Sequence, residues 1–184
     1  MKAAYIEAAG SPDAIIYGDL PQPEPAGTQV LVRVRAVSVN PIDTYLRNGA
    51  NYWELPEPFI LGCDLAGEVV AAGPQSRRFR VGDRVWGSNQ GLLGRQGTFA
   101  EFCAPEECWL YPTPEGVSDA AAAACSLVGI TAHLGLLREA NLQDGETVLV
   151  HGGSGGVGSM VVQMAKAAGA RVIATAGSDE KVRL

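Results

Sequence analysis

Positive charge is scarce in this sequence, and cysteines are not arranged as metal sites require. Lysine and arginine number 14 against 20 aspartates and glutamates, which gives a formal net charge of −6 and a pI near 4.9. Binding of nucleic acid needs a basic stripe, so this composition argues against a nucleic-acid partner. No C-x-x-C pair typical of zinc sites occurs, and nothing indicates an exported disulfide framework. We therefore expect buried free thiols at Cys63, Cys103, Cys108 and Cys125.

Long apolar runs and a secretory leader are also missing. The longest apolar stretches, such as Ala120–Cys125, are rich in alanine and too short to cross a bilayer. The N-terminus reaches Glu7 after only a few apolar residues, unlike a signal peptide. With 47% apolar and 18% charged residues, the composition is that of a globular protein. We expect a soluble cytoplasmic protein with no membrane partner.

Residues 1–114 have the pattern of short strands separated by turns. In Gln29–Val37, Val30, Val32 and Val34 fall on one face, opposite the face that carries Arg33 and Arg35, which is typical of a half-buried strand. The proline-rich segment Pro21–Pro25 cannot join a sheet ladder and is predicted as a loop. The pattern predicts a small β-rich domain with a rolled or barrel-like sheet, and further strands are expected at Asp64–Ala72, Asp83–Gly87 and Thr98–Ala104.

Residues 115–184 change to a helical and then a βαβ pattern. Ser118 can cap a helix through Cys125, and a second helical stretch covers Thr131–Arg138. A strand at Glu146–His151, a helix to Ala168 and a strand at Arg171–Thr175 follow, and Gly169 stands where a glycine would end the helix. One apolar stripe suited to packing on a sheet is formed by Val157, Met160, Val161, Met164, Ala165 and Ala168. The fold class is therefore α/β.

A glycine run joins the first strand of this unit to its helix. Gly153, Gly155 and Gly158 match G-x-G-x-x-G in the strand–turn–helix context that a dinucleotide-binding turn requires. These glycines permit a tight turn, close approach of a pyrophosphate and close helix–strand packing, while the helix N-terminus offers free N–H groups to phosphates. The alternative is a tight turn in some other α/β protein. The cofactor-binding residues expected here are Gly153, Ser154, Gly155, Gly156, Val157 and Gly158.

The end of the second strand favours NADPH over NADH. An NAD enzyme usually places an acid there to bind the ribose 2′-hydroxyl. In this chain the second strand is followed by no acid until Asp179. Ser178 and Lys181 are suited to a 2′-phosphate, by hydrogen bond and by charge. Ser178 could equally cap the next helix while Lys181 is solvated, and the two roles are compatible.

The whole chain resembles the zinc-independent medium-chain dehydrogenases/reductases, specifically the quinone oxidoreductase and zeta-crystallin group. The resemblance is carried by Val39–Gly49, Ile60–Val69, Val81–Val85, Gly97–Glu101, Ala120–Ala124, Gly129–Ala132 and His151–Gly158. It implies a GroES-like β-rich domain over residues 1–114, then an incomplete Rossmann domain over 115–184. NADPH would bind in the cleft between the two domains.

The resemblance also bears on metal binding. Zinc-dependent relatives carry an early cysteine and a Gly-His-Glu, where this chain has Asn40 and Gly62-Cys63-Asp64. With only His133 and His151 available, a closed nitrogen and sulfur site is hard to assemble. We expect no bound metal.

The same resemblance places Tyr45 and Tyr52 at the nicotinamide end of the cleft, with Asn40 and Asp43 close by and Thr131 contacting the cofactor. Structural alternatives stay open for several of these. Asn40 can be an N-cap followed by proline at N1, and Asp43 a first-turn acid favoured by the helix dipole. Tyr45 can be a core aromatic, whereas a loop position makes a purely structural role less expected for Tyr52.

Together these features predict a zinc-independent oxidoreductase that transfers hydride from NADPH to quinones. A reductase of activated C=C bonds (2-alkenals or enoyl thioesters) and a non-catalytic, crystallin-like NADPH-binding protein are the alternatives. Judged against the family, strands beyond Leu184 complete the sheet, so the 184 residues alone are expected to bind NADPH poorly and turn over little. Partners would be a small quinone or enone and, at full length, further copies in a homodimer or homotetramer.

Overall fold

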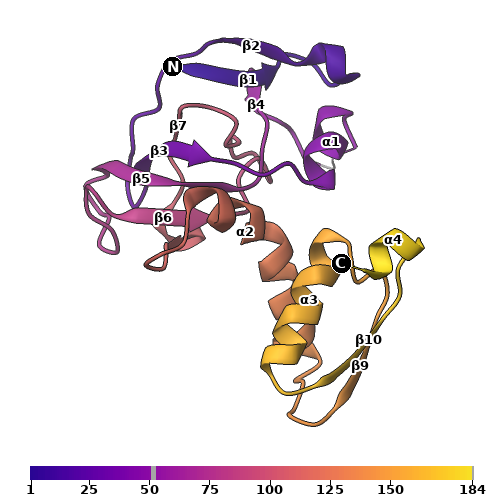
Figure 1. Cartoon of the computed structure of the whole chain (residues 1–184). Helices are drawn as coiled ribbons and strands as arrows, with labels where there is room; N and C mark the ends of the chain where they lie inside the picture. The colour runs from indigo at the N-terminus through magenta and orange to yellow at the C-terminus, as the bar shows by residue number, and fades with distance from the viewer. Residues whose placement is uncertain (51–52, 184) are drawn as a thin grey trace. The chain divides into compact units, whose positions relative to one another are not determined.

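The computed structural model describes residues 1–50 and 53–183. These fall into two compact units, Met1–Leu127 and Val128–Leu184. Figure 1 shows the strands from β1 to β7 in the first unit, and β9, α3, β10 and α4 in the second. The mixed α/β class is confirmed, whereas the domain boundary at residue 114 stays a prediction.

Two antiparallel sheets build the first unit. One has five strands in the order β7-β3-β5-β6-β8, and the other has three in the order β2-β1-β4. The strands are β1 Lys2–Ile6, β2 Ile16–Asp19, β3 Val30–Ala36, β4 Phe59–Ile60, β5 Leu65–Ala72, β6 Arg84–Gly87, β7 Phe102–Cys103 and β8 Leu110–Pro112. Short 3₁₀ turns lie at η1 (Pro12–Ala14) and η2 (Glu107–Trp109).

The alternating valines of β3 lie where their pattern predicts. Val30 and Val32 are fully buried in a core with Leu65, Val69 and other apolar side chains of the five-stranded sheet, and Val34 packs against its edge. The segment Pro21–Pro25 forms no strand. The predicted strands Asp64–Ala72 and Asp83–Gly87 are confirmed to within one residue, as β5 and β6.

The predicted strand Thr98–Ala104 is wrong in extent, because this segment crosses from one sheet to the other. At its start, the Phe99 carbonyl accepts a hydrogen bond from the Ala4 amide of β1 at 2.7 Å. Only Phe102–Cys103 then pairs with β3, at Arg33 and Val32. This segment therefore links the two sheets, as strands that pass from one sheet to another do in packed β domains.

The two helical stretches expected from Ser118 onward form one continuous helical segment. Helix α2 covers Asp119–His133 and continues into a π-helical segment, η3 (Leu134–Glu139). The Ser118 hydroxyl accepts a hydrogen bond from the Ala121 amide, which confirms the expected cap. Residues Asp119–Glu139 are long and apolar enough to cross a membrane by length and composition, so the expectation of only short apolar stretches was wrong. Core helices of soluble proteins pass the same test, and length alone therefore carries no membrane assignment.

The second unit contains the expected βαβ arrangement. Strands β9 (Thr147–Val150) and β10 (Arg171–Ala174) are parallel, with α3 (Gly156–Ala167) between them in sequence and the short α4 (Asp179–Val182) after them. Figure 1 shows α3 lying along this pair of strands. Gly169, with φ of +83°, ends α3 in the left-handed region, as its place in the sequence predicts.

The two faces of the β9–β10 sheet differ in burial. Val148 and Val172 pack on one face against Leu136, Ala165 and other apolar side chains. The paired residues Leu149 and Ile173 are exposed. One apolar face of this two-stranded sheet is therefore open within the described chain.

The cysteines divide equally between interior and surface. Cys63 and Cys103 are buried free thiols, as expected, but Cys108 and Cys125 are exposed, so the prediction was wrong for these two. Cys108 lies in η2, and Cys125 lies on α2 among small alanines that leave part of the helix surface open.

Candidate functional site

The glycine turn follows β9 and ends at the first residue of α3. Gly152 has φ of +70°, and its carbonyl accepts a hydrogen bond from the Gly155 amide at 2.9 Å. Gly155 then serves as the N-cap residue of α3 in extended conformation. The backbone therefore turns sharply and leaves the first amides of a 12-residue helix without helical partners, as an anion-binding turn requires.

The glycines of this turn serve different needs. A Cβ on Gly158 would lie 2.1 Å from the Gly152 carbonyl oxygen, and one on Gly153 would lie 2.7 Å from the Ala174 Cβ. The fold itself excludes side chains at these two positions. A Cβ on Gly155 would meet only the Gly152 oxygen, at 3.3 Å. The fold therefore demands glycine less strictly at Gly155 than at Gly153 and Gly158.

A cavity of about 440 Å³ lies beside the glycine turn in the second unit. It is lined by Gly153 and Ser154, by Thr175 after β10, and by Lys181 of α4. Three predicted cofactor residues, Gly153, Ser154 and Lys181, are thus brought together at one cavity. Gly155 precedes α3, whose first turn contains Gly156, Val157 and Gly158.

The remaining predicted residues of this unit lie elsewhere on its elements. Ser178 caps α4, where its hydroxyl accepts a hydrogen bond from the Lys181 amide, so the capping alternative holds. Thr131 lies on α2. Sequence reasoning missed Thr175, which it treated only as a strand end, although a hydroxyl residue directly after a strand that faces a glycine turn is a usable signal.

In the first unit, Asn40 and Asp43 lie at the start of α1 (Pro41–Arg47). Asn40 is the N-cap, Pro41 occupies the first turn, and Asn40 and Asp43 form a capping box. The Asp43 carboxylate accepts a hydrogen bond from the Asn40 amide at 2.7 Å. The expected structural roles of both residues are confirmed.

A buried carboxylate, Asp64, ties this helix start to two other segments. Its Oδ2 accepts hydrogen bonds from Ser38 Oγ at 2.6 Å, from Asn40 Nδ2 at 2.8 Å and from the Leu127 amide at 3.3 Å. Its backbone carbonyl accepts a further bond from Thr98 Oγ1 at 2.7 Å. Asp64, directly before β5, therefore links the start of α1 to α2 through hydrogen bonds. The sequence signal for it is a single acid inside the apolar run Ile60–Ala66.

Asp43 titrates abnormally in this setting. Burial is the main cause that raises the pKa of Asp43 to about 6, and the nearby negative charge of Asp64 raises it further. Hydrogen bonds from the Asn40 and Cys63 amides act in the opposite direction. Asp43 therefore exchanges a proton just below neutral pH, in a range where an ordinary aspartate stays ionised.

The two tyrosines expected near the nicotinamide have different outcomes. Tyr45 lies on α1 and is 53% exposed, so the alternative of a core aromatic was wrong. Its phenol is accessible to a ligand. Tyr52 lies outside the described residues.

The residues at the zinc position of related dehydrogenases do not suit zinc. Within residues 1–50 and 53–183, no group of three or more His, Cys, Asp and Glu side chains is arranged to hold a metal ion. Burial raises the pKa of Cys63 to about 11, so the thiol is protonated, and its sulfur lies 3.6 Å from Ser88 Oγ. Asp64 is already engaged by three donors. Zinc is bound by cysteine thiolates, histidine nitrogens and carboxylates, and here the thiol is protonated while the carboxylate is already hydrogen-bonded.

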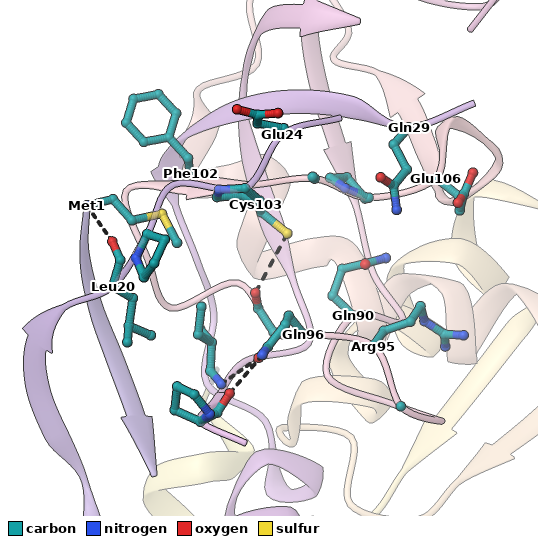
Figure 2. Close-up of a pocket in the computed structure, with 18 residues that line it drawn as sticks. Met1, Leu20, Glu24, Gln29, Gln90, Arg95, Gln96, Phe102, Cys103 and Glu106 are labelled. Carbon is teal, nitrogen blue, oxygen red and sulfur yellow. Dashed lines mark hydrogen bonds between the residues drawn. The ribbon is translucent and has the colours of Figure 1, made fainter. Parts of the chain in front are cut away.

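Figure 2 shows a second cavity of about 530 Å³ in the first unit, lined among others by Met1, Leu20, Phe102 and Arg95. None of the predicted site residues that the structure describes lines it. Its polar side chains serve the fold: the Gln96 amide bonds to the backbone at Ile60 and Pro58. The Arg95 guanidinium lies 4.9 Å from the ring centroid of Trp109. We therefore do not assign this cavity to the reaction.

Comparison with known proteins agrees with both units. Residues 26–115 match the alcohol dehydrogenase GroES-like domain. A quinone oxidoreductase of Pseudomonas aeruginosa is 40% identical over 183 residues, which are 100% of this chain and 55% of that protein. A solved mycobacterial protein in complex with NADPH is 37% identical with a TM-score of 0.88, covering 100% of this chain and 55% of that one. The structure of the CurK enoyl reductase is 30% identical with a TM-score of 0.85, covering 99% and 55%.

The chain thus combines a match to the alcohol dehydrogenase GroES-like domain with a later glycine turn in a parallel α/β unit. The chain belongs to the medium-chain dehydrogenase/reductase family, and the curated relatives to which it is similar include quinone oxidoreductases. The chain spans about half the length of these relatives, 55% in the case of the Pseudomonas protein.

Proposed function

We propose that this protein transfers hydride from NADPH to a quinone without the aid of a metal ion. The observation that carries the proposal is the glycine turn, whose cavity is lined by Lys181 and lacks an acid at the end of β10. The similarity to quinone oxidoreductases and to a protein solved with NADPH supports the same assignment.

The residues of the second unit suit the phosphates of NADPH. The amides at the start of α3 would donate to the pyrophosphate, which the absence of a side chain on Gly155 allows to come close. The ammonium group of Lys181 would pair with the 2′-phosphate, and the Ser178 hydroxyl can donate its proton to the same group while it accepts from the Lys181 amide. Thr131 on α2 and Val157 in the first turn of α3 complete the proposed cofactor-binding set.

The residues of the first unit suit an acceptor that accepts hydride readily. When bound, NADPH supplies the hydride itself. The exposed phenol of Tyr45 would donate a hydrogen bond to an acceptor oxygen, and Tyr52 is proposed for the same end of the site. Asn40 and Asp43 would act by holding the start of α1 in place, since both are engaged in its capping box. Asp43 can also hold a proton at its carboxylate below about pH 6. Protons that complete quinone reduction would come from water.

A second candidate is the reduction of activated C=C bonds, which the similarity to an enoyl reductase favours. Both reactions need the same hydride donor and an acceptor with a polarised carbonyl. Steady-state NADPH oxidation with an ortho-quinone and with a 2-enone separates them. Higher kcat/KM for the quinone is expected, and a marked preference for the enone would displace the first choice. Binding of NADPH without turnover on either substrate would favour a non-catalytic role.

Cofactor choice is tested at Lys181. Lys181→Met removes the charge while it keeps an unbranched side chain, so we expect NADPH binding to weaken about tenfold with little change in NADH binding, as for loss of one charged hydrogen bond. Equal weakening of both nucleotides would contradict the proposed 2′-phosphate contact. We propose a cytoplasmic enzyme that forms a homodimer or homotetramer. The 184 residues by themselves are expected to bind NADPH weakly, because the apolar face at Leu149 and Ile173 is open.

A further inference from the structure

Thr175, directly after β10, makes three hydrogen bonds, one to the last residue of β9 and two to the glycine turn that follows it. Its amide donates to the Val150 carbonyl at 2.9 Å, and its carbonyl accepts from the Gly153 amide at 2.9 Å. Its side-chain Oγ1 accepts from the Gly152 amide at 3.0 Å. The first two bonds are available to any residue that continues the strand pairing. The third requires a side-chain hydroxyl or another acceptor at this position.

The third bond holds the peptide before Gly152, and the bond from the Gly153 amide holds the peptide after it, so together they fix the backbone of Gly152. The Gly152 carbonyl accepts from the Gly155 amide at 2.9 Å, and it is the atom that a Cβ on Gly158 would approach to 2.1 Å. The orientation of Gly152 therefore sets both the start of α3 and how closely the helix lies against the turn. Gly152 has φ of +70° and, as a glycine, can adopt many other conformations. A side-chain bond from the neighbouring strand limits that freedom.

The Thr175 hydroxyl is placed to do this at the ligand cavity. Thr175 lines the cavity of about 440 Å³ together with Gly153, Ser154 and Lys181. Because this hydroxyl accepts from the Gly152 amide, its own proton stays available for a bond to a ligand in the cavity. The bond to Gly152 itself is present without a ligand.

We propose that Thr175 is a positioning residue for dinucleotide binding, which acts through the Gly152 amide to hold the phosphate-binding turn in its bound shape. The proposal rests on the proposed NADPH-dependent function, because it assumes that this turn receives the pyrophosphate. The part of the cofactor affected is the diphosphate common to NADPH and NADH, which distinguishes the role of Thr175 from that of Lys181.

The test compares Thr175→Val, which has nearly the same shape but no acceptor, with Thr175→Ser, which keeps the hydroxyl. Thr147→Val, at the other end of the same strand pair, makes the same chemical change away from the turn. NADPH and NADH dissociation constants are measured by cofactor fluorescence on the full-length protein, since the 184 residues by themselves are expected to bind NADPH weakly. Amide hydrogen exchange at Gly152 is measured on the same protein. We expect T175V to weaken both nucleotides by a similar factor, about fivefold to tenfold, as for loss of one hydrogen bond. T175S and T147V are expected to stay within about twofold.

Other outcomes overturn the proposal. Weakening of NADPH alone would make Thr175 a direct contact of the 2′-phosphate, and unchanged binding of both nucleotides would remove any role in binding. If the unaltered protein binds neither nucleotide, the proposed function fails, and hydrogen exchange still decides the positioning role. Exchange at Gly152 should be faster in T175V and unchanged in T175S; equal rates in all variants refute it. Should T175V not fold, Thr175→Ala with the same two measurements replaces it.

Discussion

Replacing Asp43 with asparagine removes a buried negative charge and keeps an oxygen that can accept the hydrogen bond of the Asn40 amide. The pKa of Asp43 in the folded protein is about 6, against about 3.9 for an unfolded chain. A raised pKa means that the folded state binds the proton more tightly than the unfolded state. This contribution to stability is complete below about pH 3.9 and is lost as the pH rises through about 6.

The size of the effect follows from the difference of about two in pKa. At 1.36 kcal/mol for each pKa unit, the pH-dependent part is at most about 3 kcal/mol. Partial solvation reduces it, whereas a hydrogen bond that asparagine failed to keep would cost about 1 kcal/mol equally at both pH values and leave the change with pH unaltered. We therefore expect the stability of Asp43→Asn relative to the unaltered protein to rise by about 1–2 kcal/mol between pH 4 and pH 7.5.

Urea unfolding followed by tryptophan fluorescence measures this difference. The three tryptophans, Trp53, Trp86 and Trp109, all belong to the unit Met1–Leu127 that contains Asp43. Asp13→Asn, at an exposed position, is the matched control and should change little at any pH. The reasoning is refuted if the difference between D43N and the unaltered protein is the same at both pH values, or larger in favour of aspartate at pH 7.5.

Three further substitutions test the glycine turn and a second carboxylate. Gly158→Ala places a Cβ 2.1 Å from the Gly152 oxygen, so the thermal transition followed by circular dichroism should show a loss of roughly 1–3 kcal/mol; an unchanged transition would contradict the close approach. The Cβ of Gly155→Ala would lie 3.3 Å from the same oxygen, a much milder contact. The thermal transition should therefore shift less, while NADPH binding weakens at least about tenfold. Retained affinity would show that no phosphate approaches there. The Glu107 carboxylate accepts hydrogen bonds from the Arg78 amide, the Ser76 hydroxyl and the Arg77 amide. These bonds lower its pKa, and the bond from Arg78 has the largest effect. Glu107→Gln should therefore destabilise the first unit above about pH 4.3 in urea unfolding, and the deficit should vanish in acid, the opposite trend to D43N; a deficit that persists in acid would count against this.

The opposite pH trends of Asp43 and Glu107 have a common physical origin. Both carboxylates accept hydrogen bonds from backbone amides, which favours the charged form. For Glu107 these bonds are the dominant influence, whereas for Asp43 burial outweighs them. Local sequence predicts a cap at Asp43, but its titration depends on how deeply the surrounding sheets bury it.

Local sequence patterns were enough for much of the fold and for part of the candidate site. The alternating valines of β3, the proline at the start of α1, the Ser118 cap and Gly169 at the end of α3 act through residues only a few positions away. The glycine turn belongs to this group as well, because its strand, turn and helix are contiguous. The whole-chain resemblance added the family, which the comparisons confirm.

Contacts between distant segments determined the rest. Asp64 joins Ser38 and Leu127, which are 26 and 63 positions away from it, and Thr175 reaches Gly152 across 23 positions. The segment Thr98–Cys103 divides between two sheets because each sheet offers it partners that its own pattern does not reveal. Exposure of Tyr45, Cys108 and Cys125 likewise depends on what packs beside them. A sequence pattern records the preferences of neighbouring residues, whereas burial and long-range hydrogen bonds arise only when the packed sheets and helices exclude water from particular side chains.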